Sequence, residues 1–151
     1  NALNEICGLW KSLNEDTGQP QCIFAIYEYQ GKSFGKIIAT YNQEGIMKET
    51  IYHPEERAPG VKGNPYYCGL DILWDLSKEG KKFKGKIMDP EKGDIYRADV
   101  WRIDENRLVV RGKLLCFGRN AVWQAAQPSD FPKDFKHLDL GEITPLVPQP
   151  N

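Results

Sequence analysis

Histidine is nearly absent from this sequence of 151 residues, which contains only His53 and His137. Neither residue lies at a metal-ligand spacing from a cysteine, a carboxylate or the other histidine. The chain also lacks a Gly-x-Ser-x-Gly elbow, a His-Glu-x-x-His pair and a phosphate-cradling glycine loop. We therefore predict a protein that is not an enzyme and that holds no metal and no cofactor.

Cysteine is scarce as well. The four cysteines lie far apart and include no Cys-x-x-Cys pair that would indicate zinc or a redox motif; they are Cys7, Cys22, Cys68 and Cys116. We interpret them as small buried apolar residues, or as the source of one disulfide if the protein is exported. Nothing in the sequence ranks the possible pairings.

Net charge and long apolar runs are also missing. The 20 basic and 21 acidic residues leave a formal net charge of -1, so the chain as a whole has no electrostatic footprint for nucleic acid or for an anionic membrane surface. No window approaches the roughly 20 consecutive apolar residues of a membrane span. We expect neither a nucleic-acid partner nor a membrane-spanning segment.

Strand-like alternation is present, and it is clearest after Gly69. Apolar residues recur there at every second position, which is the pattern of a strand with one buried face. This buried face would hold Leu70, Ile72, Trp74 and Leu76. Asp71 and Asp75 fall on the opposite face, where solvated carboxylates are the default. Turn-rich segments separate four further strands as far as residue 125, which predicts a five-stranded antiparallel meander.

Three more strands are predicted before this meander, over residues 6–13, 21–29 and 33–41. The 14 Gly, 10 Pro and seven Tyr of the chain are also typical of short strands and many turns. Eight sequentially connected antiparallel strands commonly remove their edges by closing. We therefore predict an all-β fold, a single eight-stranded antiparallel up-and-down barrel formed by residues 1–126.

Two segments fall outside this pattern. Residues 41–68 form a long loop after the third strand, which is either a lid over the barrel or an insertion without function. Within it, residues 46–52 could extend a strand and residues 54–57 could start a helical turn. Residues 127–151 form a Pro-rich C-terminal extension. Phe131 and Phe135 could anchor that extension across the outside of the barrel, and residues 139–151 are expected to be disordered or an extended linker.

The predicted barrel interior contains much apolar bulk. Eight strands enclose a space that is either filled by side chains or holds one small ligand, and the sequence leaves both alternatives open. The inward-facing candidates for lining a ligand are Ile37, Ile72, Trp74, Phe83, Ile87, Tyr96, Val100, Val110 and Leu114.

Closure of the barrel is predicted at its first and last strands, which become neighbours when the sheet closes. An arginine on the last strand can then lie across a tryptophan on the first strand and seal one end by a cation–π contact. We assign this structural role to Trp10, Arg119 and Trp123.

These features carry a family resemblance. Gly8-Leu9-Trp10 on a first strand with a late arginine looks like the lipocalin and fatty-acid-binding superfamily. A longer set of motifs resembles an exported bacterial family with a lipocalin-like barrel, domain-of-unknown-function family 2147, from about residue 8 to residue 126. The motifs are Gly8-Leu9-Trp10-Lys11, Gly31-Lys32, Gly35-Lys36-Ile37, Gly69-Leu70-Asp71-Ile72-Leu73-Trp74, Gly85–Gly93, Val110-Arg111-Gly112, Gly118-Arg119 and Trp123.

The resemblance implies a signal peptide removed upstream of Asn1 and a periplasmic or secreted location, and it carries no catalytic residues. Members of the family often have a Cys-x-x-Cys pair before the strand that follows Gly69, whereas here only Cys68 is nearby. A metal or disulfide role of that pair therefore does not transfer to this chain.

Two functions fit these observations. The first is binding of a small apolar or amphipathic ligand beneath the 41–68 loop, in the bacterial envelope. The alternative is a packed structural or interaction barrel that binds a protein or glycan partner on its outer surface, through the Pro-rich tail or Trp101. An enzyme would require Tyr27, Tyr96, Asp71 or a cysteine to converge in a pocket. The sequence identifies neither the ligand, the protein partner nor the oligomeric state.

Overall fold

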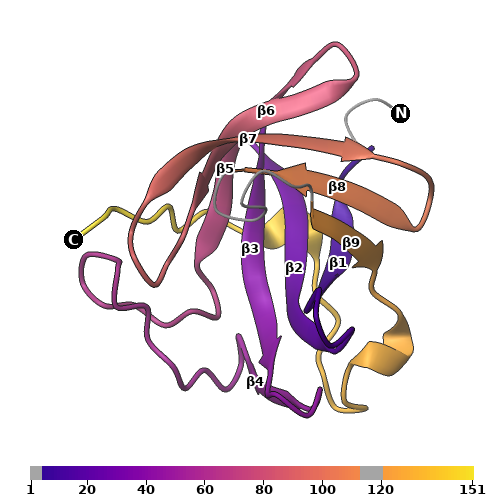
Figure 1. Cartoon of the computed structure of the whole chain (residues 1–151), viewed down its shortest axis with the longest axis vertical. Helices are drawn as coiled ribbons and strands as arrows, with labels where there is room; N and C mark the ends of the chain where they lie inside the picture. Colours follow the sequence, from indigo (N-terminus) through magenta and orange to yellow (C-terminus); the bar gives the residue numbers. More distant parts are fainter. Residues whose placement is uncertain (1–4, 113–120) are drawn as a thin grey trace.

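Antiparallel strands dominate the computed structural model, which describes residues 5–112 and 121–151 (Figure 1). Two short 3₁₀ helices, η2 (Pro128–Asp130) and η3 (Leu140–Glu142), lie in the C-terminal tail. The described part of the chain contains no helix long and apolar enough to cross a membrane. Its strands are β1 (Gly8–Leu13), β2 (Pro20–Tyr29), β3 (Lys32–Tyr41), β4 (Met47–Thr50), β5 (Asp71–Glu79), β6 (Lys82–Met88), β7 (Ile95–Arg102), β8 (Arg107–Arg111) and β9 (Ala121–Ala125).

Eight of these strands close into a barrel, which confirms the predicted fold. Neighbours from β5 to β9 follow the sequence, and the last strand returns to the first, where Trp10 lies opposite Ala125. Pairing of β2 with β3 and of β3 with β5 completes the circle. The short strand β4 pairs with the end of β3. It lies within the predicted long loop, at the residues where a further strand was considered.

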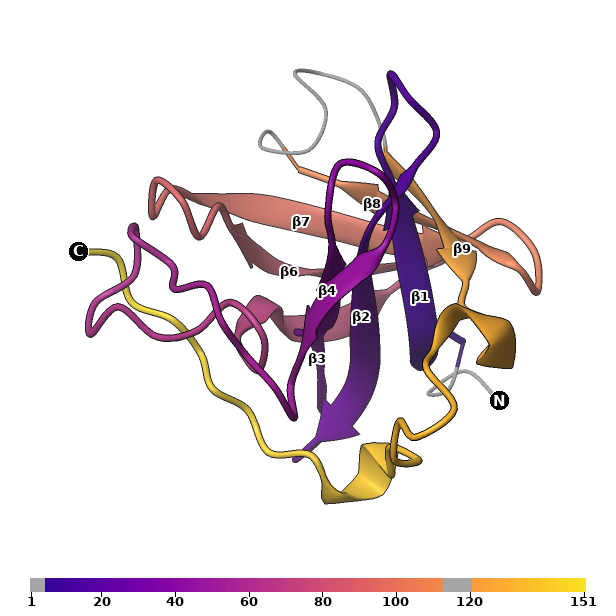
Figure 2. The ribbon, with the colours of Figure 1, turned by 90° about the horizontal axis from the view of Figure 1, so that it is seen from below.

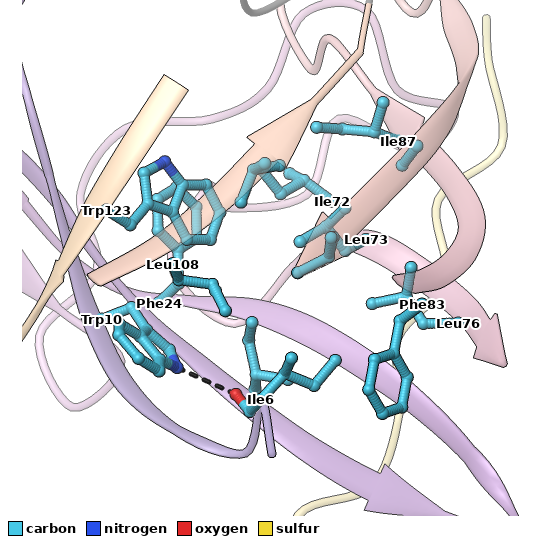
Figure 3. Close-up of a cluster of buried hydrophobic side chains, with 14 of the residues drawn as sticks. Ile6, Trp10, Phe24, Ile72, Leu73, Leu76, Phe83, Ile87, Leu108 and Trp123 are labelled. Carbon is cyan, nitrogen blue, oxygen red and sulfur yellow. Dashed lines mark hydrogen bonds between the residues drawn. The ribbon is translucent and has the colours of Figure 1, made fainter. Parts of the chain in front are cut away.

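The barrel interior is filled by buried side chains from every barrel strand and from the segment ahead of β1 (Figure 3). The rings of Phe24 and Trp123 stack inside it with centroids 4.1 Å apart and an angle of 4° between their planes. The interior set is Ile6, Trp10, Phe24, Ile26, Ile37, Cys68, Ile72, Leu73, Leu76, Phe83, Ile87, Ala98, Val100, Leu108, Val110 and Trp123.

The alternation predicted for β5 is wrong at Leu70 and Trp74. The pairing of β5 shifts register against β3 before Leu73 and against β6 after Trp74, and Asp75 has a φ of +54°. These irregularities place Ile72 and Leu73 in the same interior cluster. Leu70 and Trp74 instead pack outside the barrel, in a cluster with Tyr27, Phe34, Ala58, Val61 and Met88.

The C-terminal tail packs along the outside of the barrel (Figure 2). Phe131 and Phe135, with ring centroids 4.6 Å apart, cover the outer faces of β2 and β3, as the sequence suggested. The end of the tail is hydrogen-bonded to the segment before β5: Lys62 N donates to Gln149 O at 2.8 Å, and Asn151 N donates to Gly60 O at 3.1 Å. Disorder or a free linker over residues 139–151 was therefore the wrong expectation.

The two ends of the barrel differ. The closed end carries the entry of the chain at residue 5 and the tight turns before β3, β6 and β8. The open end carries the β1–β2 loop, the β3–β4 loop, the 51–70 segment and the β6–β7 loop. Residues 54–57, where a helical turn was considered, form no helix.

Candidate functional site at the open end of the barrel

A cation–π contact seals the closed end. Arg102, at the end of β7, places its guanidinium 5.0 Å from the ring centroid of Trp10 and donates a hydrogen bond to the backbone carbonyl of Glu5. The indole of Trp10 donates to the carbonyl of Ile6 at 2.9 Å (Figure 3). Arg119, the predicted partner of Trp10, lies outside the described residues. The cation over Trp10 is therefore Arg102 of β7, which was not predicted, because the expected partner lay on the strand that closes the barrel.

The open end contains a hollow of about 720 Å³ between the β1–β2 and β3–β4 loops, and Glu91 of the β6–β7 loop also lines it. Carboxamides dominate its wall, because five of its residues are Asn or Gln. The lining residues are Asn14, Thr17, Gln19, Pro20, Gln21, Cys22, Tyr41, Asn42, Gln43, Lys48 and Glu91.

Loop geometry holds the two asparagines of this wall in place. Asn14 Oδ1 accepts from the backbone of Asp16 and Thr17, and Asn42 Oδ1 accepts from the backbone of Glu44 and Ile46, all within 3.0 Å. Each side-chain oxygen is therefore used to shape a turn. The wall presents amide groups on fixed backbone, which suits hydrogen bonding to a polar, uncharged ligand group.

Cys22 connects the hollow to the barrel interior, since it lines the hollow and packs against the interior cluster. Burial raises the pKa of its thiol to about 12; Glu49 adds to this shift, while Lys48 and a hydrogen bond with Ser12 oppose it. Burial and Glu49 also raise the pKa of Cys68. Both thiols therefore behave as neutral, weakly polar groups at neutral pH.

The 51–70 segment is fastened to the open end. Glu49 is only 3% exposed, and its carboxylate accepts hydrogen bonds from the backbone of Glu55 and Glu56 and from the Thr40 hydroxyl. Ile51, Tyr67 and Cys68 pack against the interior cluster. Together these contacts make the segment a packed cover over part of the open end.

A buried polar cluster lies outside the barrel wall, beneath the C-terminal tail. Asp71 is fully buried, and the prediction that it is solvated is wrong. Its carboxylate accepts from the Tyr27 hydroxyl at 2.7 Å, from Lys36 Nζ at 3.1 Å and from Leu146 N at 2.6 Å. Burial raises the pKa of Asp71, although Lys36 and these hydrogen bonds pull the pKa down. Tyr27 and Asp71 thus do converge, but away from the hollow.

The nine predicted ligand-lining residues have four different outcomes. Tyr96, whose hydroxyl lies 3.4 Å from Asp94, is partly buried at the edge of the interior. Trp74 lies in the outer cluster, and Leu114 lies outside the described residues. The others are buried in the packed interior: Ile37, Ile72, Phe83, Ile87, Val100 and Val110.

The polar wall of the hollow was not predicted from the sequence. Its residues come from segments that are distant in the chain, the β1–β2 loop, the β3–β4 hairpin and the β6–β7 loop, so no spacing motif joins them. The one available signal was the concentration of Asn and Gln in the turns after β1 and β3. Among residues 5–112 and 121–151, no group of three or more His, Cys, Asp or Glu side chains is arranged to hold a metal ion.

An eight-stranded barrel with one sealed end and one hollowed end defines the lipocalin-like class. Over 92% of its length the chain superimposes on 95% of a protein from Helicobacter pylori that is described as belonging to the lipocalin family, with a TM-score of 0.67 and 17% sequence identity. At this identity the match shows the fold alone.

A family model matches most of the chain and shows the family to which the protein belongs. Residues 8–125 match the bacterial family DUF2147, described as an uncharacterized protein conserved in bacteria, and the chain belongs to this family. No curated protein shows significant similarity to it. The resemblance inferred from the sequence motifs is thereby confirmed.

Proposed function

We propose that the protein binds a small amphipathic ligand at the open end of its barrel. The observation that carries this proposal is the hollow of about 720 Å³, which has carboxamides around its wall and Cys22 at its contact with the apolar interior. A polar group of the ligand would bond to the amides, and a short apolar part would lie against Cys22 and its neighbours.

The packed interior limits how deeply such a ligand enters. Trp10, Phe24 and Trp123 fill the closed half, where each is at most 5% exposed. A long acyl chain would have to displace these rings, whereas a compact ligand fits the hollow as it stands. The function we propose is therefore binding of a compact ligand, without chemical conversion.

Native mass spectrometry before and after organic extraction tests the proposal, with binding of a compact fluorescent probe such as N-phenyl-1-naphthylamine measured alongside. We expect saturable binding that Gln21→Trp abolishes by filling the hollow. Gln124→Trp, on the exposed outer side of β9, is the matched control and should leave binding unchanged. A clean unliganded mass without saturable probe binding would contradict the proposal.

We further propose that the protein acts in the bacterial envelope. Support comes from its membership of a family conserved in bacteria and from its resemblance to exported proteins. Fractionation of a bacterium that expresses the complete natural gene should find the protein in the periplasmic or secreted fraction. Recovery with the cytoplasmic markers would contradict this location.

A further inference from the structure

Basic side chains gather on the outer face of β6, β7 and β8. Alternate residues of these strands point away from the barrel, because Phe83, Val100 and Val110 between them are buried in the interior. We call this outward set the basic face: Lys82, Lys84, Lys86, Arg97, Arg111 and, among them, Trp101. These strands lie apart from β2 and β3, which the tail covers (Figure 1).

Trp101 sits between two of the cations. Lys82 Nζ lies 4.5 Å from its ring centroid and Arg111 Cζ lies 5.1 Å from it. The indole is partly exposed, and cations from both neighbouring strands contact it. Trp101 therefore holds two cationic groups close together by cation–π contacts. These contacts leave little free ring surface on which a sugar or a base could stack.

Like charges are placed directly opposite each other on this face. Lys86 of β6 pairs with Arg97 of β7, both side chains are exposed, and neither forms an ion pair with any described residue. Such a cross-strand pair destabilises a sheet. The one acidic residue between the basic strands is Asp99, which lies opposite Lys84 on one side and Arg111 on the other. Glu79, at the end of β5, lies opposite Lys82 on the other side of β6. Five cations against two carboxylates give the face a local charge of about +3, while the whole chain carries -1.

Exposed apolar residues border the same surface. Ile95 and Ile103 follow the outward alternation of Trp101 along β7 and are 41% and 45% exposed; Val122, opposite Val109, is 44% exposed. Branched apolar side chains around a basic, tryptophan-containing surface are typical of proteins that lie in the headgroup region of a membrane.

We propose that the basic face docks the barrel on an anionic lipid surface. Charge complementarity supplies the attraction, because each Lys or Arg near such a surface raises binding about five-fold. Ile95, Ile103 and Val122 would contact the headgroup layer. From the net charge of the whole chain, we expected no binding to an anionic membrane surface. Net charge is an average, however, and the folded barrel concentrates these cations on one side.

Cosedimentation with lipid vesicles tests this inference, using pure phosphatidylcholine and phosphatidylcholine with about 30% phosphatidylglycerol. We expect binding to the anionic vesicles alone, and its loss in about 0.5 M NaCl. Lys86→Gln/Arg97→Gln should weaken binding about 25-fold. The matched control, Lys62→Gln/Lys133→Gln, makes the same change in net charge at exposed sites of the 51–70 segment and the tail, and it should bind like the unmodified protein.

Thermal unfolding shows whether each variant is folded; the variant without the Lys86–Arg97 pair should melt no lower than the unmodified protein. Lys84→Gln/Lys82→Gln is a second variant of the same face. Absence of vesicle binding overturns the inference, as does equal weakening by the face and control variants. Binding to soluble heparin without binding to vesicles would also overturn it, because it would identify a polyanion in place of a lipid surface.

Discussion

Asp71 is buried in the structure, whereas the strand pattern of the sequence predicted an exposed carboxylate. It accepts hydrogen bonds from a tyrosine, a lysine and the backbone of the tail within 3.1 Å, and it is fully buried. A carboxylate in this position joins β2, β3, β5 and the tail through one side chain. Its role here is structural, because the tail covers it.

Asp71→Asn should destabilise the fold by about 3 kcal/mol, because it leaves Lys36 buried without its charged partner. Urea unfolding measures the change. Asp75→Asn is the matched control: Asp75 is exposed at a φ of +54°, which asparagine tolerates, so we expect a change within about 0.5 kcal/mol. Equal effects of the two variants would show that the buried cluster contributes nothing specific.

Cys22 should react slowly with iodoacetamide in the folded protein. With a pKa of about 12, its thiol is roughly one ten-thousandth ionised at pH 8, so alkylation should speed up about tenfold per pH unit from pH 8 to pH 11. Peptide mapping by mass spectrometry follows the reaction, with urea-unfolded protein as the control. A rate like that of the unfolded chain would contradict the raised pKa of the Cys22 thiol.

The same raised pKa affects stability. Between about pH 9 and pH 12 the folded state keeps a proton on Cys22 that the unfolded state has lost. The folded state therefore binds more protons, and the contribution of this group to stability falls as the pH rises. The stabilising contribution of Cys22 is fully present below about pH 8, which is below the pKa of an unfolded cysteine.

At the scale of the element, β5 and β6 show what alternation can and cannot predict. The period of two placed Phe83, Ile87, Val100 and Val110 on interior faces, where the structure has them. It failed at Trp74, because the register shift against β3 before Leu73 turns Leu73 inward and Trp74 outward. The second shift, with positive φ at Asp75, returns Leu76 to the interior. Bulges depend on contacts with the neighbouring strand, so a single strand's sequence does not reveal them.

Gly85 makes room for this irregularity. A Cβ atom added to it would lie 2.5 Å from the carbonyl oxygen of Trp74 and 3.0 Å from the backbone of Asp75. Gly85→Ala should therefore destabilise the protein by about 2 kcal/mol, which chemical denaturation would measure. Lys84→Ala, at the adjacent exposed position, should stay within about 0.5 kcal/mol. If Gly85→Ala left the free energy of unfolding unchanged, β5 and β6 would be able to move apart at this point without loss of stability.

At the scale of the whole molecule, the tail stabilises the barrel as a strap. Leu146 and Asp71 exchange backbone and side-chain hydrogen bonds, and the tail ends against Gly60. Deleting residues 144–151 should lower stability by about 3 kcal/mol, since it uncovers the buried carboxylate and its apolar neighbours. Thermal unfolding would measure this. Deleting residues 149–151 should have a smaller effect, and equal losses would contradict a role for the Leu146 contact.

The sequence predicted the barrel well and its site poorly. Strand count, connectivity and most interior residues follow from local alternation and turn residues, which each segment carries by itself. The seal by Arg102, the burial of Asp71 and the carboxamide wall all depend on segments brought together only by closure of the sheet. Such contacts have no fixed spacing in the chain and therefore leave no motif.

The placement of the chain ends has a practical consequence for handling the protein. Residue 5 enters at the sealed end of the barrel, whereas Asn151 is bonded to Gly60 in the segment that covers the open end. A surface or label attached through the N-terminus would leave the hollow facing solution. The same attachment through the C-terminus would crowd the loops around the hollow, so the two orientations should give different apparent affinities for one ligand.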